Sequence, residues 1–382
     1  MRTLVPDKID PIQRGNEYRK LMMKIEAGQT KFLISKIAGT KQETDTPLFR
    51  GSFRVREYIK TRDSSDWMQK WQHASFEEVL SPTFLGLDDS GMQKLEFQNP
   101  AYVAAYRLGG DPRDYNNVFT VQVTGCCYEC SFCYVPRELN NPTLGHGSFF
   151  SAREILDAFE KARGEYSSKG IAVNVIRLSG GEVTTLVPEL ITNINLEINQ
   201  RNMPRVPYLW VDTNLSSTTH LEPIESELKV LARQRNIGFV GCLKAVGNRH
   251  TGSDDFSTIT GASPKFFETQ FGVLDYLVNE IKADFYVYIL PIVLADETHT
   301  RNRLRELFDE LRAIHKNLPL RTNMLTIHEY TPTKTNLEDA KKEGRPLNSY
   351  GEKSSFVTWY RILKENYPSN ELMRYRCQVP LS

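Results

Sequence analysis

The chain has 382 residues, 40% of them hydrophobic, and its 48 Lys and Arg against 47 Asp and Glu leave a formal net charge of +1. This length suits one large domain or two smaller ones. The near-neutral balance gives no support for broad electrostatic binding to nucleic acid or to an anionic membrane.

No segment of the sequence predicts a signal peptide or a membrane span. The first twenty residues carry charges throughout and lack the apolar core of a signal peptide. The longest apolar run, residues 285–295, is too short to cross a bilayer and contains Pro291. We therefore expect a cytoplasmic protein with no membrane partner, whose clustered thiols act as metal ligands or catalytic groups rather than in disulfides.

From residue 117 onward, predicted strands alternate with predicted helices. A capping box of Ser151 and Glu154 opens the first helix, and Ser263 with Pro264 opens a later one. The polar stretch 247–256 reads as a solvated loop. The alternation predicts βαβ units and a parallel sheet, and six units predict a partial (β/α)6 TIM-like barrel. The predicted strands cover residues 118–123, 173–178, 208–213, 237–246, 284–290 and 322–327.

The first 116 residues break this rhythm and predict a mixed α/β accessory region of unknown fold. We therefore predict three parts: the accessory region 1–116, the barrel 117–335, and a C-terminal extension 336–382 that packs on the barrel. The accessory region could form a lid, a substrate-selecting domain or a surface that docks a partner.

Four of the six cysteines lie within eight residues, directly after the first predicted barrel strand. Cys126, Cys130 and Cys133 form the spacing C-x3-C-x2-C, and thiolates at this spacing suit an iron–sulfur cluster or zinc. Three thiolates on a four-iron cluster leave one iron open to an external ligand. The alternative is a zinc site with Cys127 or a distant residue as fourth ligand. Otherwise Cys127 is a small buried apolar residue.

The sequence Gly180, Gly181, Glu182 ends the second predicted strand. The glycines allow the backbone to approach a ligand closely, and Glu182 offers an acceptor to an ammonium group. A tight strand-to-helix turn explains the three residues equally well. Because ligands gather at the carboxyl ends of parallel barrel strands, we expect this turn and the cysteine loop to meet there.

Together, these two motifs resemble the signature of the radical S-adenosylmethionine (SAM) superfamily. The resemblance implies a [4Fe–4S] cluster on Cys126, Cys130 and Cys133, with SAM bound to the open iron through its amino and carboxylate groups. It implies reductive cleavage of SAM to a 5′-deoxyadenosyl radical that abstracts hydrogen from a substrate, and an electron donor such as flavodoxin or ferredoxin. It also places Tyr134 near the adenine and makes Cys127 a bystander.

A second resemblance, over residues 118–333, is to the glycyl-radical-enzyme activases, the family of the pyruvate formate-lyase activating enzyme. Asp212 and Asn214 in "VDTN" resemble the Asp-Thr-Asn strand end of that family. Lys244 in "GCLKAV" resembles its lysine near the SAM carboxylate, and His328 in "TIHEYTP" resembles its SAM-contacting histidine. Each has a plain alternative: a turn cap for Asp212 and Asn214, a surface lysine for Lys244, and an ordinary histidine for His328.

Cys242 departs from the activase pattern, in which an aspartate at this position helps to bind a monovalent cation. The cation site is therefore in doubt, and the thiol could face the substrate or simply pack. Lys244 alternates with apolar residues in a predicted buried strand, where an unpaired lysine is unfavourable. Lys244 and Cys242 are therefore the candidate catalytic residues.

The sequence thus predicts a radical SAM enzyme whose substrate is a small molecule, a peptide or a protein. The long N-terminal region, absent from the small activases, favours a stand-alone enzyme over an activase that installs a glycyl radical on a partner enzyme. A nucleic-acid substrate has no basic patch to support it, although it stays open. The alternative of a different class is a non-catalytic zinc- or cluster-binding module, which leaves the Gly-Gly-Glu turn unexplained.

Overall fold

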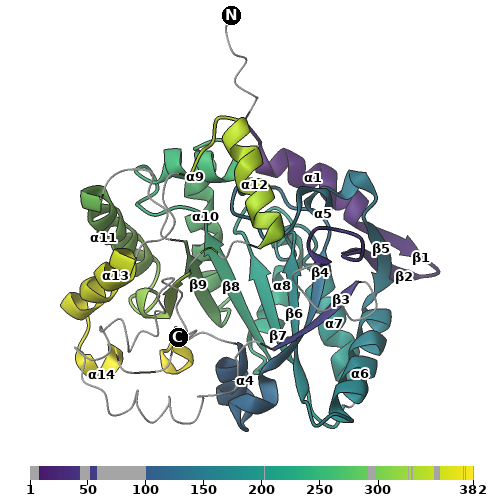
Figure 1. Ribbon diagram of the computed structural model, residues 1–382. Helices are drawn as coiled ribbons and strands as arrows, with labels where there is room; N and C mark the ends of the chain where they lie inside the picture. The colour runs from purple at the N-terminus through teal and green to yellow at the C-terminus, as the bar shows by residue number, and fades with distance from the viewer. Residues whose placement is uncertain are drawn as a thin grey trace, which may run out of the picture.

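The computed structural model describes residues 8–43, 52–57, 100–201, 203–290, 297–325, 327, 330–347, 353–372, 374 and 376–381. Its described strands form one ten-stranded sheet. Helices cover the outside of the sheet, and the strands run toward the end of the molecule where α1, α9 and α12 lie (Figure 1).

Six parallel strands form the main part of the sheet, and each lies beside the next one in the sequence. A chain that winds in one direction in this way places its helices on one face, as in a barrel. β4 is bordered on its other side by β2 and β3, so the sheet is open. The partial barrel predicted from the sequence is therefore confirmed. The six strands are β4 (Asn117–Val123), β6 (Val173–Gly180), β7 (Tyr208–Thr213), β8 (Ile237–Leu243), β9 (Phe285–Ile289) and β10 (Thr322–Met324).

Helices connect these strands as the sequence predicts. The capping box at the first of them is present: Ser151 Oγ accepts from the Glu154 amide at 3.2 Å, and a Glu154 carboxylate oxygen accepts from the Ser151 amide at 2.7 Å. The connecting helices are α6 (Ala152–Ser167), α7 (Glu189–Gln200), α8 (Glu225–Ala232), α9 (Ser253–Thr260), α10 (Phe266–Asp275) and α11 (Glu297–Ile314).

The alternation of side chains along the strands separates two faces of the sheet. On the outer face, residues such as Phe119, Ile176 and Val211 join the large apolar cluster that the helices cover. On the inner face, the lower positions are apolar and aromatic, including Trp210 and Tyr286. The upper inner positions are polar: Gln122, Ser179, Asp212 and Cys242. The polar end of the lumen is therefore the carboxyl end of the strands.

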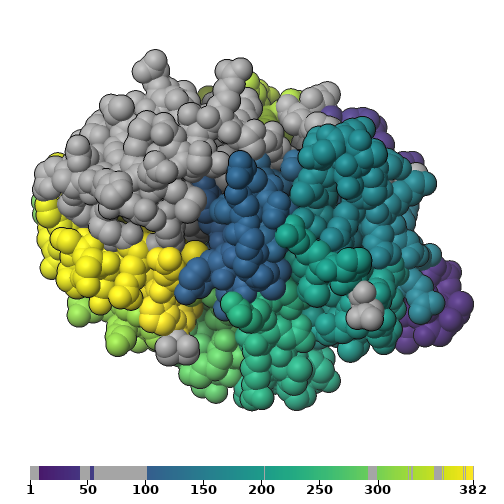
Figure 2. Space-filling view, turned by 90° about the horizontal axis from the view of Figure 1, so that it is seen from below, coloured from purple at the N-terminus to yellow at the C-terminus, as the bar shows by residue number. Residues whose placement is uncertain are grey.

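The opposite end of the lumen is closed by α4 (Pro100–Leu108), whose alanines and Val103 join the inner cluster. Figure 2 views this end, with α4 in blue next to the C-terminal segment in yellow. A buried ion pair lies at the same end: Arg321 Nη1 donates to Asp284 at 2.5 Å, and Arg321 Nε donates to the Val379 carbonyl at 2.7 Å. Among the described residues, α4 and the C-terminal segment therefore cover the end of the lumen opposite the cysteine loop.

The described part of residues 1–116 belongs to the same sheet as the barrel. β3 (Phe53–Glu57) pairs with β4, and β5 (Gly147–Ser151) pairs with β2 (Gln29–Ser35), both antiparallel. This stretch is mixed α/β, as expected. Its other described elements are α1 (Pro11–Met22), β1 (Met23–Glu26), α4 and a short 3-10 helix (Pro112–Tyr115). None of the described helices is long and apolar enough to cross a membrane.

The described C-terminal residues form three α-helices and a short 3-10 helix (Arg376–Gln378), and α13 packs on α11. The division into three parts, with residues 336–382 as an extension that packs on the barrel, remains a prediction. The helices are α12 (Thr331–Lys342), α13 (Lys353–Asn366) and α14 (Ser369–Leu372).

Three predicted boundaries are wrong. β8 ends at Leu243 rather than 246, because the Lys244 amide donates to the side chain of Gln270 at 3.1 Å and not to a neighbouring strand. β10 ends at Met324 rather than 327. The end of the predicted loop 247–256 is the start of α9, whose first turn carries Asp254 and Asp255, a placement that suits the positive end of a helix.

Candidate active site

The cysteine loop lies at the carboxyl end of β4. Cys126, Cys130 and Cys133 are partly buried, and Cys127 is fully buried in the outer apolar cluster. The loop closes on α5 (Arg137–Asn140), since the Cys126 amide donates to the Asn140 carbonyl at 2.9 Å. The three thiols that the sequence predicts as ligands are thus partly accessible, and the fourth is a core residue.

Neighbouring elements fix the backbone of this loop from outside. The amides of Glu129 and Ser131 donate to carbonyls at the end of α9, each at 2.9 Å. Asn336 of α12 donates to the Cys133 carbonyl at 2.9 Å and to the Val135 carbonyl at 3.0 Å. Arg14 of α1 pairs with Glu129 at 2.7 Å. Helices α1, α9 and α12 therefore all help to position the loop.

The Gly-Gly-Glu turn lies directly against the start of the cysteine loop. The Gly181 amide donates to the Val123 carbonyl at 3.0 Å, and the Glu182 amide donates to the Gly125 carbonyl at 2.8 Å. A Cβ at Gly181 would lie 1.9 Å from that Gly125 oxygen. Gly180 has φ +99°, and its Cβ would lie 2.0 Å from a side-chain carbon of Gln122. The glycines permit two neighbouring strand ends to touch, and the motifs meet as expected.

The Glu182 side chain is 0% exposed and faces the strand ends rather than the lumen opening. Its carboxylate accepts from the Thr185 amide at 2.9 Å, from the Thr213 hydroxyl at 3.0 Å and from the Asn214 amide. Burial raises the pKa of Glu182, although these hydrogen bonds act in the opposite direction. In this arrangement Glu182 joins the ends of β6 and β7, and its contact with the SAM ammonium group remains a prediction.

Amide groups surround two of the three candidate ligand sulfurs. Asn214 Nδ2 donates to Cys126 Sγ at 3.4 Å and to Cys127 Sγ at 3.3 Å. Cys133 Sγ accepts from the Val135 amide at 3.4 Å and from Asn140 Nδ2 at 3.5 Å. Such N–H donors are typical of the surroundings of metal-bound thiolates, where they stabilise negative charge on sulfur.

The thiols also affect one another. Burial raises the pKa of Cys130, the Lys244 charge lowers it, and the charges of Cys133 and Cys126 raise it further. Burial likewise raises the pKa of Cys133, whereas a hydrogen bond from Cys127 lowers that of Cys126. Three thiolates can share this place at neutral pH only if a cationic group joins them, since bound metal offsets their repulsion.

These residues fit a cluster held by Cys126, Cys130 and Cys133. Within the described ranges, no three His, Cys, Asp or Glu side chains form a site for a single metal ion. The three thiolates of a four-iron cluster bind three different irons. They therefore need not converge on one point, as the ligands of a single metal ion must.

Lys244 faces the cysteine loop. Its Nζ lies 5.9 Å from the centre of the ring of Phe132, a residue of the loop between Cys130 and Cys133. Burial lowers the pKa of Lys244, but the thiols of Cys242 and Cys130 raise it by more, so the ammonium form is favoured. The lysine lies just past the end of β8 on the same side as Cys242. Lys244 is partly buried, and its contact with SAM remains a prediction.

Tyr134 and Asp212 belong to one chain of hydrogen bonds in the lumen. Ser179 Oγ donates to Asp212 at 2.5 Å, so the 2.8 Å contact between Tyr134 and Ser179 has the tyrosine as donor. Arg177 Nε and Nη2 donate to Asp212 at 2.9 and 2.7 Å. Burial raises the pKa of Tyr134 to about 12, so the phenol stays protonated. Asp212 therefore already holds an arginine and a serine, and its contact with SAM remains a prediction.

Gln270 of α10 holds the ends of β7 and β8 together. Its side chain is fully buried; Nε2 donates to the Asn214 carbonyl at 2.6 Å and to the Cys242 carbonyl at 3.3 Å, and Oε1 accepts from the Lys244 amide. It thus orients three residues that the sequence singled out. Gln270, Asn140 and Asn336 were not predicted, because no local motif marks them. His328 lies outside the described residues.

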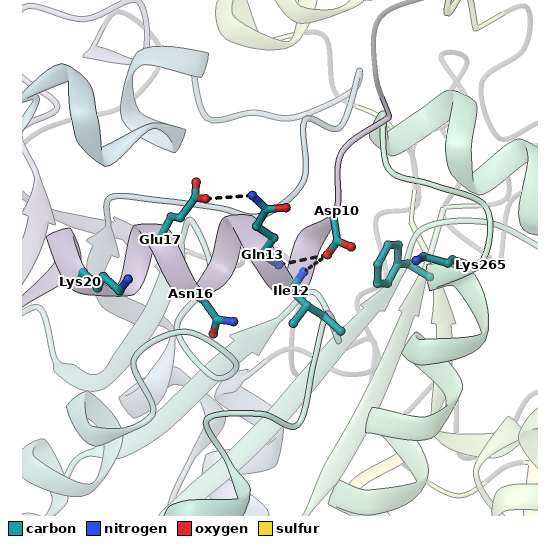
Figure 3. A pocket seen from close by; sticks show the side chains of 8 residues that line it. Asp10, Ile12, Gln13, Asn16, Glu17, Lys20 and Lys265 are labelled. Carbon is teal, nitrogen blue, oxygen red and sulfur yellow. Dashed lines mark hydrogen bonds between the residues drawn. The ribbon is translucent and has the colours of Figure 1, made fainter.

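A surface pocket of about 490 Å³ lies beside α1, next to the start of α10 (Figure 3). Its helix residues project from the side of α1 that is turned away from the cysteine loop, whereas Arg14 projects toward the loop. None of the predicted site residues lines it. The lining residues are Asp10, Ile12, Gln13, Asn16, Glu17, Lys20, Lys265 and Phe266.

No protein-family profile and no curated protein matches this sequence. Among solved structures, the chain is similar to a spore photoproduct lyase variant with bound AdoMet and dinucleoside spore photoproduct, at 13% identity and TM-score 0.42, over 66% of this chain and 75% of that one. It is also similar to spore photoproduct lyase complexed with the dinucleoside spore photoproduct, at 14% identity and TM-score 0.40, over 64% and 72% of the two chains.

Proposed function

We propose that this chain is a radical SAM enzyme. Cys126, Cys130 and Cys133 would hold a [4Fe–4S] cluster, and SAM would bind beside it at the carboxyl end of the barrel. When bound, these groups supply reductive cleavage of SAM to a 5′-deoxyadenosyl radical that abstracts a hydrogen atom from the substrate. The residues of this chain position both groups and shape the polar lumen in which the substrate reacts.

The contact between the two motifs carries this proposal. The C-x3-C-x2-C loop and the Gly-Gly-Glu turn are 47 residues or more apart in sequence, yet two backbone hydrogen bonds join the turn to Val123 and Gly125, directly before the loop. Lys244 and Asn214 reach the same loop from β8 and β7. A zinc-binding module would need neither the glycine contact nor a lysine facing the thiols.

The substrate and partners belong to the same proposal. A small molecule, a peptide or a protein would enter the lumen, and a low-potential carrier such as flavodoxin or ferredoxin would supply the electron. We favour a stand-alone enzyme over a glycyl-radical activase, because the described N-terminal strands extend the barrel sheet and α1 pairs with the cysteine loop through Arg14.

The proposal is tested by iron, sulfide and zinc analysis of anaerobically prepared protein. We expect about four irons and four sulfides per chain, as one cubane cluster requires. Incubation with dithionite and SAM should then release 5′-deoxyadenosine, and deuterium passed to it from a labelled candidate compound would identify the substrate. Zinc in place of iron would support the non-catalytic module.

Lys244→Met is expected to weaken SAM binding about tenfold or more, the scale of one lost charge-assisted hydrogen bond of about 1.5–3 kcal/mol. The change keeps the length and the apolar stem of the side chain but removes the ammonium group that faces the cysteine loop. Titration of SAM into the anaerobic protein, followed through the spectrum of the cluster, measures the effect.

Lys229→Met is the matched control, because Lys229 lies on α8 and pairs with Glu225. It should bind SAM as the unchanged protein does. If Lys244→Met also gives an unchanged curve with its cluster intact, the activase resemblance at this position is wrong, and the weaker one at His328 loses support.

A further inference from the structure

Two buried asparagines connect to the predicted cluster ligands, and neither belongs to the C-x3-C-x2-C motif. Asn140 is 8% exposed and Asn214 is 6% exposed. Their side-chain amides donate to Cys133 and to Cys126, respectively. Cys130, the third thiol, has no such amide donor among the described residues, and faces Lys244 instead.

Asn140 spans both ends of the cysteine loop. Its carbonyl accepts from the Cys126 amide at 2.9 Å, and its Nδ2 lies 3.5 Å from Cys133 Sγ and 3.4 Å from the Val135 carbonyl. It is the last residue of the short helix α5, seven residues after Cys133. Its position relative to both cysteines is therefore set by backbone contacts as well as by the side chain.

Asn214 is held on its backbone from two sides. Its amide donates to Glu182, and its carbonyl accepts from Gln270 Nε2 at 2.6 Å. These contacts leave only the side-chain torsions free, and the amide nitrogen lies against Cys126 and Cys127. The Glu182 carboxylate thus helps to position Asn214 beside the cysteine loop.

The amide orientation follows from chemistry. An iron-bound thiolate accepts hydrogen bonds and cannot donate them, so each asparagine must turn its NH₂ group toward sulfur. The carbonyl oxygens, Asn140 Oδ1 and Asn214 Oδ1, are then buried without a partner among the described residues. A buried unpaired carbonyl costs stability.

We propose that Asn140 and Asn214 set the reduction potential of the cluster. This inference rests on the proposed function. One-electron reduction adds one negative charge to the cluster and its thiolates, and N–H dipoles directed at two of the sulfurs stabilise that charge. The amides thereby raise the potential and let a low-potential carrier deliver the electron more readily.

The test is a potentiometric titration with dithionite, followed by electron paramagnetic resonance, on Asn140→Leu and Asn214→Leu. Leucine has nearly the same size as asparagine but no N–H donor. Each variant should shift the midpoint to more negative potential by enough to lower the ratio of reduced to oxidised cluster about tenfold at a fixed potential, which is about 59 mV for one electron. The double variant should shift further.

Asn195→Leu is the matched control. Asn195 lies in α7, is 5% exposed, and also leaves its Oδ1 unpaired. Its amide has no sulfur acceptor within the described part of the chain. The control should keep the midpoint of the unchanged protein, so that a shift in the test variants reports the N–H···S contacts and not the general loss of a buried amide.

A wild-type midpoint in both variants, with full iron and sulfide content, would overturn the inference while leaving the proposed function intact. Loss of the cluster from both Asn140→Leu and the milder Asn140→Ala, together with Asn214→Leu, would also overturn it, since the asparagines would then be structural braces. An equal shift in Asn195→Leu would do the same. Failure of the proposed function is distinguishable, because the unchanged protein would then contain no four-iron cluster to titrate.

Discussion

Cys130→Ala is expected to leave the protein without its iron–sulfur cluster. Cys130 is one of three partly buried thiols that share the loop after β4, and burial raises its pKa. A cluster bound by two thiolates instead of three would have two open irons and no third anchor to the chain. Iron and sulfide analysis after anaerobic reconstitution should give values near background, and the absorbance of the cluster should disappear.

Cys127→Ala is the control, because Cys127 is adjacent to a predicted ligand yet fully buried in the outer cluster. Burial raises its pKa well above the ordinary value, so it is a neutral thiol. This variant should keep wild-type iron and sulfide. Full iron content in Cys130→Ala, or its loss in Cys127→Ala, would contradict the assignment of the ligands.

The strands of the barrel were predictable because their sequence pattern is local. Runs such as residues 208–213, rich in aromatic and β-branched residues, give the strand directly. The ends were harder, because tertiary contacts decide them. Lys244 lies outside the sheet because its amide donates to the side chain of Gln270 on α10. The sequence of β8 does not indicate where that helix lies.

In the candidate site, too, the residues in local motifs were predictable and the residues that act through tertiary contacts were not. The cysteines and the Gly-Gly-Glu turn are short motifs, so the sequence was sufficient to expect that they meet. Asn140 and Gln270 act through single side-chain amides from α5 and α10, and their importance depends on which strand ends lie beside them. The sequence did not indicate that Glu182 is buried and hydrogen-bonded to Thr213 at the end of β7, and its predicted contact with a ligand remains a prediction.

Gly181→Ala is expected to destabilise the protein by about 3 kcal/mol, the upper end of the range for overpacking a well-packed interior. The new Cβ would lie 1.9 Å from the Gly125 carbonyl oxygen and 2.6 Å from its carbon. A backbone carbonyl cannot move aside as a flexible side chain can. The two strand ends must separate, which weakens the hydrogen bonds from Gly181 to Val123 and from Glu182 to Gly125. Urea denaturation of the apoprotein should show a lower midpoint with an unchanged slope.

Gly272→Ala provides the matched glycine control, since Gly272 lies at an exposed position of α10 with nothing within 4 Å of the new Cβ. It should be neutral or stabilising by up to about 1 kcal/mol, because alanine favours the helix more than glycine does. The two variants also distinguish between two explanations of why residue 181 must be glycine. If Gly181 is required only to leave room for the methionine part of SAM, Gly181→Ala will unfold at the wild-type urea concentration and lose SAM affinity alone. If the contact with Gly125 requires it, the apoprotein itself will be less stable before any ligand is added.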